Sequence, residues 1–122
     1  MILDGQTKVY GIFGYPVKHS KSPTFQTAAF LHLGINAVYV PFEVNPDDLE
    51  KAVESLKVLK IAGVNITIPH KENVINYVNE LSEEVKIIKA ANTIKNIDGY
   101  LIAYNTDWIG FIEGLKELDP NL

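Results

Sequence analysis

Asn65 and Thr67 are the first residues of this sequence whose type and spacing suggest chemistry. They lie two positions apart in the apolar run 61–68, which is typical of a buried strand. Alternate side chains of a strand point to the same face, so both polar groups share one face. Burying that face costs free energy unless something hydrogen-bonds to it. We therefore interpret the pair as part of a binding site.

Lys71 and Asp107 are the residues most suited to proton transfer. Lys71 follows the run 61–68, and Asp107 follows a second apolar stretch, 100–104. A lysine close to a carboxylate and partly shielded from water can pass a proton to or from a reacting oxygen. Taken alone, Lys71 is more simply a surface lysine, and Asp107 is more simply an acid at a helix N-terminus. The catalytic interpretation therefore requires the fold to bring the two together.

Hydroxyl and amide side chains accompany other apolar runs. Ser20 and Ser22 come after the run 7–14, and Asn92 lies in the run 91–97. Each has a plain structural explanation, since Ser22 can cap a helix and Ser20 can stabilise a turn. Together with Lys71 and Asp107, however, they form an inventory that suits a neutral polyol or a hydroxy acid bound by many hydrogen bonds.

The predicted elements explain how these segments could meet. We predict strands at 7–14, 36–44 and 61–68, with Pro41 placing the second at a sheet edge or a bulge. Helices are predicted from Ser22-Pro23 to Gly34, from 45 to 59, at 71–78 and at 82–89. A hairpin of 91–97 and 100–104 turns at Asp98-Gly99, and a terminal helix begins near 106–107.

This order of elements predicts the fold class. Alternating strands and helices imply right-handed crossovers and a mainly parallel sheet, to which the hairpin adds one antiparallel strand. We therefore predict an α/β fold, specifically a three-layer α/β/α sandwich. Ligands of such sheets bind beyond the carboxyl ends of the strands, where most of the polar segments lie.

Composition excludes several classes of function. The 122 residues carry a net charge of −4, and all eleven basic residues are lysines, so no arginine is available to read guanine or grip a phosphate. The lysines alternate with acids rather than forming a basic stripe, which disfavours nucleic-acid binding. With no cysteine and with three well-separated histidines, the sequence predicts neither a disulfide nor a metal site.

Other motifs are missing from the sequence. It has no G-x-G-x-x-G or P-loop for a nucleotide and no G-x-S-x-G for a serine nucleophile. No apolar run approaches the roughly 18 residues of a membrane span, and the first residues do not resemble a signal peptide. We expect one domain in the cytoplasm, without a membrane or nucleic-acid partner. Oligomeric state is left open.

Four polar segments resemble the signature motifs of the shikimate dehydrogenase family. They are GYPVKHSKSP at 14–23, NITIPHK at 65–71, ANT at 91–93 and YNTDWIG at 104–110. The resemblance implies that Ser20 and Ser22 bind the carboxylate of shikimate, and that Lys71 with Asp107 handles the proton. It assigns the ring hydroxyls to Asn65, Thr67, Asn92 and Asp107. One local departure is Gln26-Thr27, where many members have His-Asn.

The resemblance also implies an activity and a cofactor. Members reduce 3-dehydroshikimate reversibly to shikimate with NADPH, in the biosynthesis of aromatic amino acids. NADP is held by a Rossmann-type domain that is absent from this chain, and no metal is used. We expect residues 1–106 to form the substrate-binding domain and residues 107–122 to begin the helix that leads to the nucleotide domain. The 122 residues alone should bind shikimate weakly and not turn over.

Three alternatives stay open from the sequence. The chain could belong to a branch of the family that uses quinate, or one that uses NAD. It could be a stand-alone shikimate-binding module without catalysis, although keeping both Lys71 and Asp107 argues against that. It could also be a protein-interaction domain, for which Trp108 and Phe111 on the terminal helix would supply an apolar patch.

Overall fold

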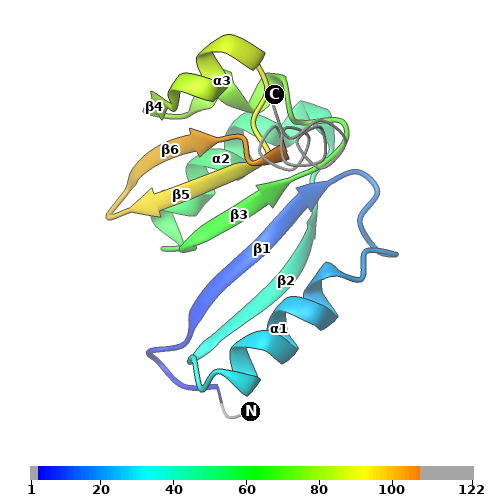
Figure 1. The fold of residues 1–122 in the computed structure, drawn as a ribbon, viewed down its shortest axis with the longest axis vertical. Coiled ribbons are helices and arrows are strands. Elements are labelled where there is room, and N and C mark those ends of the chain that lie inside the picture. The colour runs from blue at the N-terminus through cyan, green and yellow to red at the C-terminus, as the bar shows by residue number, and fades with distance from the viewer. Residues whose placement is uncertain (1–2, 108–122) are drawn as a thin grey trace, which may run out of the picture.

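A single mixed sheet organises the chain (Figure 1). The structure is a computed structural model that describes residues 3–107. Within them the strand order is β2-β1-β3-β5-β6-β4. The strands are β1 (Lys8–Gly14), β2 (Ala37–Glu43), β3 (Gly63–Ile66), β4 (Glu80–Leu81), β5 (Thr93–Ile97) and β6 (Tyr100–Tyr104). The helices are α1 (Ser22–His32), α2 (Leu49–Val58) and α3 (Glu83–Ile88), with short 3₁₀ helices η1 (Pro46–Asp48) and η2 (Asn73–Tyr77).

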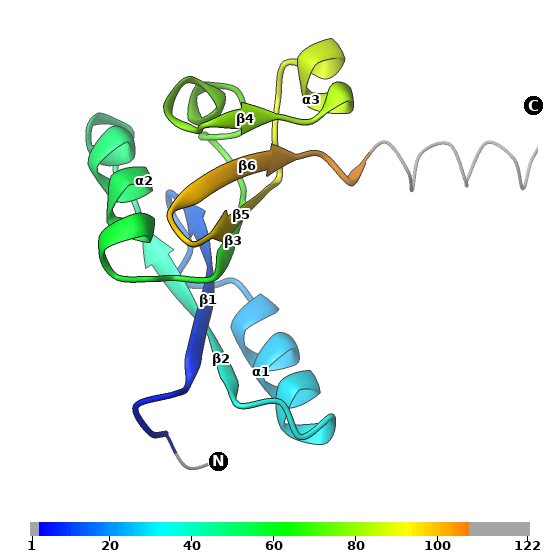
Figure 2. The same cartoon turned by 90° about the vertical axis from the view of Figure 1, so that its left-hand side faces the viewer.

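Strand directions confirm the predicted sheet. β1 pairs in parallel with β2 and β3, and β4 pairs in parallel with β6. Only β5 runs against its neighbours, β3 and β6, within the described residues. β2 is an edge strand, as Pro41 indicates. Helices α1 and α2 lie on opposite faces of the sheet, which gives the three-layer sandwich (Figure 2).

The antiparallel direction of β5 brings distant segments to one edge. Because β5 is reversed, β6 runs in the same direction as β3, so both strands end at the edge where β5 begins. Lys71 follows β3, Asn92 precedes β5 and Asp107 follows β6. The sheet topology therefore delivers all three to the same rim.

Helix α2 covers the apolar face of the sheet. Leu49, Val53 and Leu56 are buried at helical spacing and join the main core cluster with residues of the strands, such as Ile94 and Leu101. The helix predicted at 45–59 includes Leu59, but this residue is 67% exposed, because the helix ends at Val58 and Leu59 is its C-cap.

Helix α1 has no buried residue and begins differently from our prediction. Ser22 is its first residue, Lys21 occupies the N-cap position, and no side chain caps the helix. The Ser22 hydroxyl is therefore not used as a cap. The predicted end is confirmed, since Gly34 has φ of +70° just after the C-cap.

The central elements are shorter than predicted. The strand predicted at 61–68 is reduced to β3, and Thr67 and Ile68 lead into a turn closed by the bond from His70 N–H to Thr67 O. The helix predicted at 71–78 is the 3₁₀ helix η2. Strand β4 was not predicted, because two residues are too few to show a period.

The last elements agree with their sequence signals. Ser82 caps α3 by accepting a hydrogen bond from Val85 N–H. Asp98 and Gly99 have φ of +51° and +90°, as a tight hairpin turn requires. The predicted helix from Trp108 onward lies outside the described residues.

Gly14 ends β1 where the chain packs against Thr67. A Cβ at this position would lie 2.4 Å from Thr67 Cγ2 and 2.5 Å from Val17 Cγ1. Both neighbours are β-branched and cannot easily turn aside. We predict that Gly14→Ala lowers the free energy of unfolding by about 1–3 kcal/mol.

Urea denaturation measures this loss, and Gly5→Ala is the matched control because a Cβ there meets no heavy atom within 4 Å. If the two variants had equal urea midpoints, a Cβ at Gly14 would be accommodated by movement of the Thr67 segment without loss of stability, contrary to the prediction.

Candidate functional site

Lys71 and Asp107 meet, as the catalytic interpretation required. Lys71 Nζ lies 3.0 Å from Asp107 Oδ2, and the side chains are 38% and 60% exposed. An ion pair so open to water adds little to stability. Both groups are instead accessible to a small molecule bound at this edge of the sheet.

Asn92 holds the other side of the carboxylate. Its Nδ2 donates to Asp107 Oδ1 at 2.8 Å and to Thr106 Oγ1 at 2.9 Å. Its Oδ1 accepts from Thr106 N–H at 3.1 Å and from the Thr93 hydroxyl at 3.0 Å. Asn92 is buried, and its amide is fully hydrogen-bonded. The two oxygens of Asp107 thus have separate donors, which fixes the orientation of the carboxylate.

The pKa of the Asp107 carboxyl lies below its ordinary value of 3.8. The main cause is the hydrogen bond from Lys71; partial burial opposes it, and the hydrogen bond from Asn92 and the positive charge of Lys71 add to the lowering. Asp107 is therefore ionised throughout the neutral range. It can orient the lysine and accept hydrogen bonds from hydroxyl groups.

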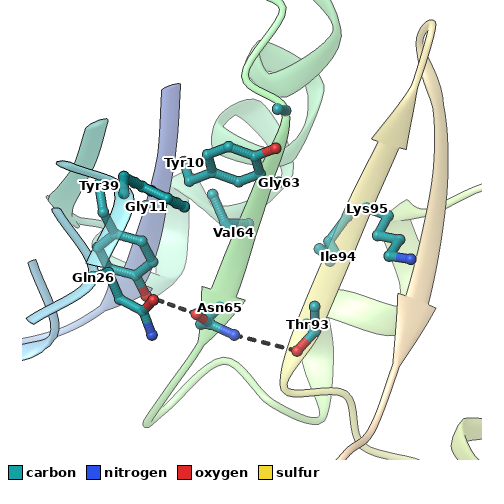
Figure 3. A pocket seen from close by; sticks show the side chains of 12 residues that line it. Tyr10, Gly11, Gln26, Tyr39, Gly63, Val64, Asn65, Thr93, Ile94 and Lys95 are labelled. Atoms are coloured by element: carbon teal, nitrogen blue, oxygen red, sulfur yellow. Dashed lines mark hydrogen bonds between the residues drawn. The ribbon is translucent and has the colours of Figure 1, made fainter. Parts of the chain in front are cut away.

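Asn65 joins this group through two partners that sequence reasoning did not assign to the site. Its Nδ2 donates to Thr93 Oγ1 at 3.2 Å, and its Oδ1 accepts from the Tyr39 hydroxyl at 2.7 Å (Figure 3). Thr93 faces Asn65 across the β3–β5 pairing. The motif at 91–93 contained Thr93, but its contact depends on the strand register. Tyr39 gave no signal in the sequence beyond its β-strand propensity.

Ser20, Ser22 and Thr67 line a pocket of about 320 Å³, and neither Lys71 nor Asp107 is among its lining residues. Its other lining residues are Ile12, Pro16, Val17 and His19. Ser22 N–H donates to Ser20 Oγ at 3.3 Å, so the two serines are held close. The seven predicted site residues thus form two groups, one of hydroxyls and one built around Asp107.

His70 has a structural explanation. It is buried, and its Nε2 lies 2.7 Å from the carbonyl oxygen of Val44, to which it can donate. This bond ties the turn after β3 to the end of β2. In the range 3–107 no group of three or more His, Cys, Asp or Glu residues could hold a metal ion. In the same range no helix is long and apolar enough to cross a membrane.

Comparison with known proteins identifies the family. Residues 12–94 match the family model described as the shikimate dehydrogenase substrate binding domain. The chain belongs to this family. The matched range includes Ser20, Ser22, Asn65, Lys71 and Asn92, and the predicted Thr67 as well.

Relatives of the shikimate dehydrogenase family extend the match to the whole chain. The NADP(+) enzyme of Caldanaerobacter subterraneus subsp. tengcongensis is 52% identical over 122 residues, which are 100% of this chain and 44% of the relative. That of Aquifex aeolicus is 47% identical over 121 residues, or 99% of this chain and 45% of the relative. The chain therefore spans less than half the length of these shikimate dehydrogenases.

Solved structures of shikimate dehydrogenases share the fold. The A. aeolicus crystal structure has a TM-score of 0.90 and 48% identity, and the match covers 98% of this chain and 45% of that one. A Listeria monocytogenes shikimate 5-dehydrogenase, solved in complex with shikimate and NAD, has a TM-score of 0.89 and 35% identity, with 97% and 41% covered. The predicted family and α/β fold are confirmed.

The ion pair has a pH dependence that can be measured. Because folding lowers the pKa of Asp107, the stabilisation from this group is complete above the ordinary value of 3.8 and is lost as the pH falls through the folded pKa. We predict a midpoint below 3.8 for Asp107 when its carboxyl carbon is titrated by ¹³C NMR, and a higher one in Lys71→Met.

The exposed Lys51, which lies on α2 away from the site, supplies the control. Lys51→Met should leave the Asp107 midpoint unchanged. A midpoint at or above 3.8 in the unaltered chain would contradict the ion pair.

Proposed function

We propose that this chain is the substrate-binding part of an NADP-dependent shikimate dehydrogenase, which reduces 3-dehydroshikimate reversibly to shikimate. The observation that carries the proposal is the 3.0 Å contact between Lys71 and Asp107, with Asn92 holding the second carboxylate oxygen. Membership of the family supports the choice of substrate. The Listeria relative was solved with shikimate, which supports it further.

Lys71 provides the proton. Reduction of the ketone places a hydride on the carbonyl carbon and a proton on its oxygen. In the proposal the Lys71 ammonium donates that proton, and in the reverse direction the amine removes it from the hydroxyl. Asp107 keeps the ammonium pointed at the reacting oxygen and accepts a hydrogen bond from a ring hydroxyl. Both side chains are exposed enough to touch a ligand.

The remaining residues bind the rest of the substrate. Ser20 and Ser22 donate hydroxyl hydrogen bonds to the carboxylate, a role that suits a sequence without arginine. Asn65 and Thr67 read ring hydroxyls. Asn92 does so by exchanging its hydrogen bond to Thr106 Oγ1 for one to the ligand, because its amide is fully hydrogen-bonded without ligand. The amides of Asn65 and Asn92 are already oriented by their hydrogen bonds, which reduces the ordering that binding requires.

The cofactor belongs to the part of the enzyme outside this chain. NADP supplies the hydride when it is bound there. We propose that residues 1–106 form the substrate-binding domain and that residues 107–122 begin the link to the nucleotide domain. Thr106 and Asp107 both bond to Asn92, so the site reaches across that boundary. We place the enzyme in the cytoplasm, in line with the absence of cysteine from these 122 residues.

Shikimate binding to the 122-residue chain tests the first half of the proposal. We predict weak, saturable shifts of the ¹⁵N–¹H signals of Lys71, Asn92 and the two serines when shikimate is added. Tight binding would instead favour a stand-alone binding module. Absence of any saturable shift would overturn the shikimate assignment for this chain.

Lys71→Ala tests the proton-transfer role. The assay needs the chain continued through an NADP-binding domain, for example the remainder of the A. aeolicus enzyme. We predict that the variant lowers kcat for 3-dehydroshikimate by about 100- to 10,000-fold, the usual contribution of a general acid, while KM changes far less. Stopped-flow absorbance of NADPH measures the rate.

Lys51→Ala is the matched control, since Lys51 is an exposed lysine of α2 outside the site. It should retain full activity. If Lys71→Ala did so too, Lys71 would not be the proton donor, even though the chain could still bind shikimate.

A second candidate is a branch of the family that uses quinate or NAD. The Listeria relative was solved with NAD, which makes this alternative specific. Rates measured for shikimate and quinate with each cofactor decide between them, and we expect the highest kcat/KM for shikimate with NADP.

A further inference from the structure

We propose that Tyr39 is a positioning residue that fixes the orientation of the Asn65 amide at the substrate site. The inference deepens the proposed function and rests on it, because Asn65 is there assigned to a ring hydroxyl. Tyr39 lies on the edge strand β2, and neither the sequence motifs nor the family match assigns it a role. A series of hydrogen bonds links Asp107 to Tyr39 through the side chains of Asn92, Thr93 and Asn65.

Asp107, at the charged end of this series of hydrogen bonds, fixes the orientation of the Asn92 side-chain amide. An ionised carboxylate only accepts hydrogen bonds, so Nδ2 of Asn92 must face Asp107. Oδ1 of Asn92 then faces the other way, where it accepts from the main-chain N–H of Thr106. That N–H can only donate, which confirms the orientation independently. The remaining contact of Oδ1 is the Thr93 hydroxyl at 3.0 Å, which must therefore donate to it.

The Thr93 hydroxyl passes this direction on to Asn65. A hydroxyl has one proton, and Thr93 uses it toward Asn92, so its oxygen has to accept from Asn65 Nδ2. The carbonyl oxygen of Asn92, 3.5 Å from the same Nδ2, also requires a donor on that side. Oδ1 of Asn65 consequently faces Tyr39, and the phenol must donate. In each hydrogen bond of this series, the donor thus lies on the Tyr39 side and the acceptor on the Asp107 side.

Tyr39 is well held for this purpose. Its side chain is 6% exposed, and the Thr27 hydroxyl of α1 bonds to both its main-chain N–H and its carbonyl, at 3.1 and 3.3 Å. Burial also raises the pKa of Tyr39 to about 12, so the phenol keeps its proton at working pH. In Figure 3 the phenol and Thr93 lie on either side of Asn65, at the edge of a pocket of about 220 Å³.

This arrangement decides what a ligand meets at Asn65. With Tyr39 and Thr93 in place, the amide cannot exchange its oxygen and nitrogen, and one acceptor position of Oδ1 is already used. Without the phenol, Oδ1 loses its donor and the amide is held only through Nδ2, so the position of Oδ1 is less tightly fixed. A ring hydroxyl would then meet an acceptor whose position varies, and its recognition would weaken.

Tyr39→Phe removes the hydroxyl and keeps the ring. The first test uses the ligand-free chain, in which the side-chain amide signals of Asn65 are followed by ¹⁵N–¹H NMR. We expect them to shift and broaden in Tyr39→Phe. Tyr10→Phe is the matched control, because Tyr10 lines the same pocket and its hydroxyl makes no hydrogen bond to the described residues. It should leave the Asn65 signals in place.

The second test measures ligand recognition. We expect Tyr39→Phe to weaken shikimate binding about three- to tenfold, the effect of one hydrogen bond, and Tyr10→Phe to have no effect. In the extended enzyme the loss should appear in KM rather than kcat, since the Lys71–Asp107 pair is intact. Binding is also measured for a set of shikimate analogues that each lack one ring hydroxyl. Tyr39→Phe and the unaltered chain should bind one of these analogues equally well, namely the one that lacks the hydroxyl contacted by Asn65. A structural defect would weaken all of them equally.

The outcomes separate this inference from the proposed function. If the unaltered chain does not bind shikimate, the proposed function fails, while the ligand-free signals of Asn65 still test the positioning. If those signals are the same in Tyr39→Phe, or if Tyr10→Phe changes them equally, the positioning role is overturned.

Discussion

The buried amide of Asn92 is the constraint on which the site depends. An amide in that position has to be hydrogen-bonded at both ends, because an unpaired buried polar group costs about 1–3 kcal/mol. Its partners come from Thr93 on one side and from Thr106 and Asp107 on the other, so they span the whole β5–β6 hairpin. Its main chain adds bonds to Ile66 and Tyr104. Folding therefore cannot satisfy Asn92 without also placing Asp107.

That constraint is met because β5 is reversed in an otherwise parallel sheet. A fully parallel arrangement would begin β5 at the opposite edge, away from the residues that follow β3. The two-residue turn at Asp98-Gly99, where both residues adopt positive φ, then sends β6 back in the direction of β3, so that Thr106 and Asp107 return to the edge where β5 begins. Asn96 then accepts from Gly99 N–H through its side chain and donates to two carbonyls near the end of α2. The hairpin is thus anchored at its turn as well as at the site.

Much of this arrangement follows from local sequence signals. The hairpin, the helix ends at Gly34 and Ser82, and the edge position of β2 are local effects of glycine, serine and proline, and they were predicted. A cap at Ser22 was predicted and is absent, the strand at β3 was predicted too long, and β4 was not predicted, because each depends on the chain that packs around it. The same division applies at the site. Asn65, Lys71 and Asp107 were found from composition and position, whereas Tyr39 and Thr93 act through strand register, which a sequence does not display.

In the proposed function, the exposure of the Lys71–Asp107 pair makes this geometry only part of a catalytic site. Coulomb interactions between groups open to water are screened, and they strengthen several-fold in a site from which water is excluded. With exposures of 38% and 60%, the pair is positioned but not yet shielded. Substrate and the covering part of the enzyme would supply that shielding. The hydrogen bonds from Asn92, in contrast, already exist without ligand, so the carboxylate needs no reorientation when the site closes. The proposed function therefore divides the work: this chain orients the reacting groups, and burial by the rest of the enzyme gives that orientation its catalytic effect.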